Sequence, residues 1–65
     1  MSILVNGRMH DVPEPPTLAA LLVALAPPIP FAVACNGEFV PYGAYDDFRI
    51  ESGDSIDIVH PTAGG

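Results

Sequence analysis

The sequence predicts an α+β fold, in which one main helix packs across a mixed sheet of four to five strands and a flexible tail follows the last strand. Asn-Gly pairs at residues 6–7 and 36–37 each follow an apolar segment, and Asn-Gly is the pair that two-residue hairpin turns favour. Between these pairs, residues 17–26 carry leucines at helical spacing. The chain therefore predicts a hairpin, a helix, a strand with a short return, and a final strand.

The first half of the chain contains the hairpin and the helix. The turn at residues 6–7 is expected to join residues 3–5 to a return strand at residues 8–12, which the prolines of residues 13–16 end because proline cannot donate to a ladder. Thr17 is a good helix N-cap, and Pro27 terminates the helix after about ten residues. The stripe that should pack on the sheet comprises Leu18, Leu21, Leu22 and Leu25.

The second half supplies the remaining strands. Residues 31–35 are expected to form a buried strand, residues 38–40 a short return, and residues 42–47 an irregular crossing segment. Residues 56–59 then form the final strand, with Ile56 and Ile58 on its buried face. A hairpin, one crossover helix and a last strand parallel to the first make the β-grasp arrangement.

Composition limits the kind of protein that this chain can be. With 65 residues there is room for one domain, residues 1–65, and the hydrophobic content of 49% is that of a globular chain. Eight acidic residues face two basic ones, for a net charge of −6, which disfavours nucleic acid and favours a basic protein surface. The sequence has no membrane-length apolar run and no signal peptide, and its single cysteine excludes an internal disulfide. We expect a cytoplasmic protein.

Residues that would carry catalysis are missing from the sequence. There is no lysine, no phosphate-binding glycine loop and no His/Cys cluster at metal spacing. Cys35 lies in an apolar strand with no neighbouring cation to lower its pKa, so it is expected to be a buried hydrophobe. We expect no catalytic residue, no metal and no bound cofactor, which leaves the role of a substrate or carrier.

The remaining chemical group is the carboxylate at the end of the tail, residues 60–65. Thr62, Ala63 and Gly64 make a narrow thread that ends at Gly65, and six residues can extend about 20 Å. A terminal carboxylate has a pKa of about 3.5 and is a poor electrophile when ionised. It has to be activated, most simply as an acyl adenylate, and ATP must then be bound by a partner.

The chain resembles the ThiS family of ubiquitin-like β-grasp sulfur carriers. The features that carry the resemblance are the element order, Asn6-Gly7, residues 36–41, residues 53–56 and residues 63–65. The resemblance implies that a ThiF-like adenylyltransferase adenylates Gly65 with ATP. It further implies that a sulfur donor system such as a cysteine desulfurase then yields a thiocarboxylate. This group would supply sulfur to the thiazole synthase ThiG in thiamine biosynthesis. Tyr42 departs from the family pattern, in which Arg often follows the Val-Pro pair.

Three other functions of a chain that ends in two glycines remain open. A MoaD-like carrier would supply sulfur to molybdopterin or another sulfur-containing metabolite. A ubiquitin-like modifier would form an isopeptide bond, and a structural module would use neither chemistry.

A partner surface is also expected. It would comprise the exposed side of the final strand and the aromatic residues Phe39, Tyr42 and Tyr45. The alternative for the tyrosines is a half-buried place in the core.

Overall fold

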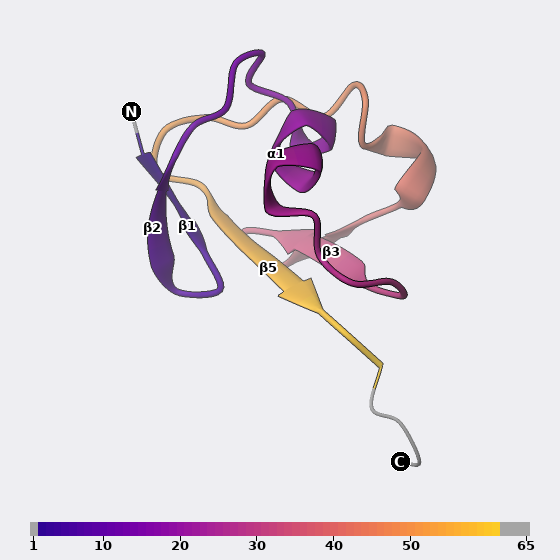
Figure 1. The fold of residues 1–65 in the computed structure, drawn as a ribbon. Coiled ribbons are helices and arrows are strands. Elements are labelled where there is room, and N and C mark those ends of the chain that lie inside the picture. Colours follow the sequence, from indigo (N-terminus) through magenta and orange to yellow (C-terminus); the bar gives the residue numbers. More distant parts are fainter. Residues whose placement is uncertain (1, 62–65) are drawn as a thin grey trace.

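The computed structural model describes residues 2–61 and contains one α-helix and five strands in that range (Figure 1). The elements are β1 (Ser2–Val5), β2 (Arg8–Asp11), α1 (Leu18–Leu25), β3 (Ala32–Cys35), β4 (Glu38–Val40), a 3₁₀ turn η1 (Tyr42–Ala44) and β5 (Ser55–Val59). The order is the predicted one. The strand limits differ from the predicted limits by one residue each in β1, β2, β3 and β5.

The five strands form one mixed sheet in the order β2-β1-β5-β3-β4. The first and last strands are parallel neighbours, with Val5 opposite Ile56, and all the other pairs are antiparallel. This parallel pair needs a crossover connection, and the chain between β2 and β3 supplies α1 for it. The predicted ubiquitin-like β-grasp fold is therefore confirmed, with five strands, and β5 is the central strand.

Both predicted hairpin turns are present. Asn6 and Gly7 have φ values of 50° and 81°, and Asn36 and Gly37 have values of 52° and 86°. Type I′ turns require positive φ at both central residues, and their twist matches that of the flanking strands. Each Asn-Gly pair therefore fixes the register of its hairpin.

The helix begins where the sequence predicts and ends earlier. Thr17 is extended, and its Oγ1 accepts a hydrogen bond of 3.1 Å from the backbone N–H of Ala20, which caps the first turn. The helix ends at Leu25 because Ala26 adopts a left-handed conformation, with its N–H donating to Leu22 O. The sequence predicts a helix that continues to Ala26 and is terminated by Pro27, so the observed helix ends one residue before the predicted limit.

The core lies between α1 and one face of the sheet. Leu18, Leu21 and Leu22 are buried, and Leu25 is partly buried against them, so the predicted leucine stripe is confirmed as core. The strands contribute alternate residues to the same cluster, as the two-residue period of a strand requires. The sheet residues of the core are Ile3, Val5, Val33, Cys35, Val40, Ile56 and Ile58.

The segment between β4 and β5 provides hydrogen-bond acceptors for the amino-terminal end of α1. The first N–H groups of a helix have no partner within it. Here Leu18 N–H donates to Phe48 O at 2.9 Å, and Ala19 N–H donates to Tyr45 O at 3.1 Å. The irregular crossing segment predicted at residues 42–47 thus begins with η1 and supplies one acceptor for α1, and Phe48, the residue after it, supplies the other. No helix within residues 2–61 is long and apolar enough to span a lipid bilayer.

Candidate functional site

The candidate site is the carboxyl end of β5, from which the chain continues toward Gly65. His60 and Pro61 are exposed there, and the His60 ring meets Phe31 edge to face, with 6.4 Å between the ring centroids. The predicted site residues Thr62, Ala63, Gly64 and Gly65 lie outside the described residues. The structure therefore defines the base of the tail and the central strand that leads to it.

Two asparagines hold β5 at its opposite ends. Asn6 accepts a 2.7 Å hydrogen bond at Oδ1 from Ile58 N–H and donates one of 3.2 Å from Nδ2 to Ile58 O. Asn36 accepts a 2.9 Å hydrogen bond at Oδ1 from Ser55 N–H and donates one of 3.0 Å from Nδ2 to the Asp54 carboxylate. Both side chains belong to the hairpin turns. Their turn role is predicted by the sequence, and their hydrogen bonds to β5 are a second role that the Asn-Gly pattern does not indicate.

The sheet face turned away from α1 carries exposed apolar side chains. Because Ile56 and Ile58 point to the core, Val59 points to the other face, and it is 57% exposed. Phe39 is 68% exposed and lies opposite Ala34 on the same face. We call this surface the open face; its large exposed apolar residues are Leu4, Met9, Phe39 and Val59.

The structure separates the three aromatic residues that were predicted to form one partner surface. Phe39 lies on the open face. Tyr42 is 85% exposed on η1, near α1, where its ring meets Tyr45 edge to face at 5.5 Å. Tyr45 itself is only 9% exposed and belongs to the core. Tyr45 therefore offers little surface to a partner, contrary to the prediction, because its side chain belongs to the core, and the half-buried alternative is closer to its state.

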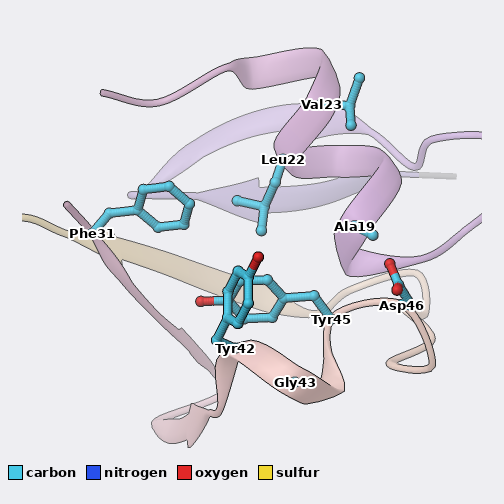
Figure 2. Close-up of a pocket in the computed structure, with 8 residues that line it drawn as sticks. All are labelled: Ala19, Leu22, Val23, Phe31, Tyr42, Gly43, Tyr45 and Asp46. Atoms are coloured by element: carbon cyan, nitrogen blue, oxygen red, sulfur yellow. The ribbon is translucent and has the colours of Figure 1, made fainter. Parts of the chain in front are cut away.

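A hollow of about 370 Å³ lies between α1 and η1 (Figure 2). Ala19, Leu22 and Val23 form its helix wall, and Phe31 closes one end. The opposite wall is formed by Tyr42, Gly43, Tyr45 and Asp46. None of these lining residues is basic, so the hollow offers no positive charge to a nucleotide phosphate.

Comparison with known proteins decides the family. The sequence profile of the ThiS family matches residues 3–65. The chain belongs to the ThiS family. A crystal structure of a thiamine biosynthesis protein (ThiS) from Geobacter metallireducens is similar over its whole length. Its TM-score is 0.82 and its sequence identity is 26%, with 100% of each chain covered. No curated protein sequence matches significantly.

The surroundings of the thiol in this ThiS-family chain favour its neutral form. Cys35 is buried at the end of β3. Burial raises its pKa above the ordinary value of 9.0, and the carboxylate of Asp54 and the charge of Glu38 raise it further. A neutral thiol is a poor nucleophile. The prediction that Cys35 is a buried hydrophobe fits this position, and within residues 2–61 no group of three His, Cys, Asp or Glu side chains could hold a metal.

The raised pKa of Cys35 predicts a specific pH dependence of stability. The folded state favours the protonated thiol, so its contribution is fully present below the unfolded-state pKa and is lost as pH rises through the folded-state pKa. We expect urea unfolding to show a fall in stability above about pH 9 that is smaller in Cys35→Ser. Native Cys35 should also react slowly with iodoacetamide at pH 8 and fast in denaturant. Fast native labelling would contradict the assignment.

Proposed function

We propose that this chain is a sulfur carrier of thiamine biosynthesis that holds its sulfur as a thiocarboxylate at Gly65. The observation that carries the proposal is the family match, because it spans residues 3–65 and so includes the two final glycines. The likeness to the Geobacter metallireducens protein over both whole chains supports the same pathway. In this proposal the chain is acted on by its partners and is not itself an enzyme.

The chemistry begins with activation of the Gly65 carboxylate. A carboxylate oxygen attacks the α-phosphorus of ATP on a ThiF-like adenylyltransferase, pyrophosphate leaves, and an acyl adenylate results. A persulfide on a donor such as a cysteine desulfurase then attacks the carbonyl carbon, AMP leaves, and an acyl disulfide forms. A second thiol of the partner system reduces this disulfide, which releases the donor thiol as a new disulfide and frees the thiocarboxylate. The resulting thiocarboxylate is a sulfur nucleophile that thiazole synthase (ThiG) consumes. ATP is the cofactor of the partner, and this chain binds none.

In this proposal the folded body of the domain is the surface that the partners bind. The open face presents Phe39 and Val59 beside the strand that leads to the tail. A partner bound there covers apolar side chains and holds the base of the tail near its own active site. The net charge of −6 would speed association with a basic partner surface. The same face can serve the adenylyltransferase and the synthase in turn, because both must receive the same tail.

The test is mass spectrometry of the loaded protein. After incubation with a ThiF-like enzyme, Mg-ATP and a sulfur donor, the intact mass should show one oxygen replaced by sulfur. Fragmentation should locate the sulfur at Gly65. Cys35→Ser, the control for thiol chemistry, should be loaded equally well, because Cys35 is buried. Sulfur on Cys35, or no sulfur at all, would overturn the proposal.

A further inference from the structure

The two Asn-Gly turns differ in which end of β5 they hold. Asn36 binds Ser55 N–H at the start of the strand, and Asn6 binds both backbone groups of Ile58 near its end. Ile58 is only two residues before His60, where the tail begins. Asn6 therefore holds the part of β5 from which the reacting thread departs.

Strand β1 is too short to hold this end of β5 by itself. The parallel register between the two strands pairs Leu4 with Ser55 and Val5 with Ile56. Asn6 N–H then donates to Ile56 O at 2.8 Å, and there the backbone turns away, with φ 50° at Asn6. The Asn6 side chain continues the ladder in place of a further strand residue. It supplies one acceptor and one donor to Ile58, as a parallel neighbour would.

The other edge of β5 is held by β3, which pairs with the strand as far as Val59 through Ala32. With the Asn6 side chain in place, the end of β5 around Ile58 has a partner on both edges, Asn6 on one and β3 on the other. Without its side chain, this end would keep hydrogen bonds on one edge only, and the last residues of the strand could swing about that edge. A partner that draws the tail into its active site in an extended form would then receive the end of the chain displaced by such a change of direction.

We infer that Asn6 is a positioning residue for activation of the terminal carboxylate. Its side chain fixes the point and direction at which the tail leaves β5, so that Gly65 meets the α-phosphorus of ATP while the body is bound to the partner. This inference rests on the proposed function. The step depends on the geometry of attack, so a displaced exit lowers the rate of adenylation without loosening the docked body.

Asn36 provides a matched control for the stabilising effect of such a side chain. It is the same residue type in the same kind of turn, with φ 52° against 50° for Asn6. Each makes two side-chain hydrogen bonds. Replacing either by glycine keeps the positive φ without strain and removes only the side chain. Both variants should therefore lose stability at opposite ends of β5, and Asn6→Gly should lose more, because its hydrogen bonds are partly buried and those of Asn36 are exposed.

The experiment compares these two variants with the wild type on a ThiF-like enzyme at a temperature where all are folded. Affinity without ATP is measured by calorimetry, and kcat and KM are measured by pyrophosphate release at saturating ATP. We expect kcat to fall about tenfold or more in Asn6→Gly and less than about twofold in Asn36→Gly. The Kd of both should stay within about twofold of wild type, since the open face is unchanged. Amide exchange should speed up at Ile58 in the first variant and at Ser55 in the second.

Equal kcat values in the two variants, or a loss confined to Kd or KM, would overturn the positioning role. If the wild type is itself not adenylated, the proposed function fails. That failure is distinct from failure of the positioning role, because it is seen without any variant. Should Asn6→Gly fail to fold, Asn6→Asp and Asn36→Asp replace the pair. The aspartates keep an oxygen that can accept the strand N–H and lose the Nδ2 donor. In Asn36→Asp the new carboxylate also faces that of Asp54, which makes this variant the harsher control for lost stability. The loss of kcat should then again be larger in Asn6→Asp than in Asn36→Asp.

Discussion

Removal of Gly65 is expected to abolish adenylation and thiocarboxylate formation and to leave the domain folded. The shortened chain still ends in a glycine carboxylate, because Gly64 becomes the last residue. Its chemistry is unchanged, and only its reach is reduced, by about 3.4 Å. Since a misplacement of about 1 Å can cost 100-fold in rate, the loss should be at least of that order. The described core extends from Ile3 to Ile58, so the unfolding midpoint should not change.

The matched control for this deletion is Ala63→Gly, which keeps the full length and the narrow thread. It should be adenylated within a few-fold of wild type, because the carboxylate keeps its reach. Pyrophosphate release and intact mass measure the reaction, and urea unfolding measures the fold. Adenylation of the shortened chain at near the wild-type rate would show that reach does not matter. Loss of the folded state would show that the end of the chain belongs to the core.

Most of the fold could be predicted because its signals are local. Asn6-Gly7 and Asn36-Gly37 fix two hairpins through a backbone conformation that few residue pairs accept. The leucine spacing fixes the buried side of α1. The helix end could not be predicted, because Ala26 has no preference for the left-handed conformation that it adopts. The sequence feature closest to the helix end that predicts termination is the pair of prolines after Ala26.

The parts of the site that were missed depend on long-range contacts. Tyr45 lies in an irregular segment with no period, so its sequence neighbourhood does not distinguish an exposed ring from a buried one. Asn6 and Asn36 already had a sufficient reason to be asparagine in their turns, which hid their bonds to β5. A signal was available for Asn6. The predicted parallel pairing of the first and last strands ends at this turn, and an amide there can continue the ladder.

Ile56→Ala is expected to unfold most of the protein. Ile56 is 0% exposed at the centre of the sheet, opposite Val5 on one side and Cys35 on the other. Truncating a buried isoleucine costs about 2–5 kcal/mol, and a domain of this size has a total stability of about 3–5 kcal/mol. Ile56→Val removes one methylene and should cost about 0.5–1.5 kcal/mol. Urea unfolding followed by circular dichroism measures all three proteins.

The exposed neighbour on the same strand supplies the control, since Val59→Ala should change stability by no more than about 0.5 kcal/mol. Equal losses at both positions would contradict the assignment of the two faces of β5. The loss of function in Ile56→Ala should follow from unfolding alone, because the reacting carboxylate is untouched. An osmolyte such as trimethylamine N-oxide favours burial and should restore sulfur loading to Ile56→Ala. It should restore none to the chain that lacks Gly65, because that chain is folded and too short.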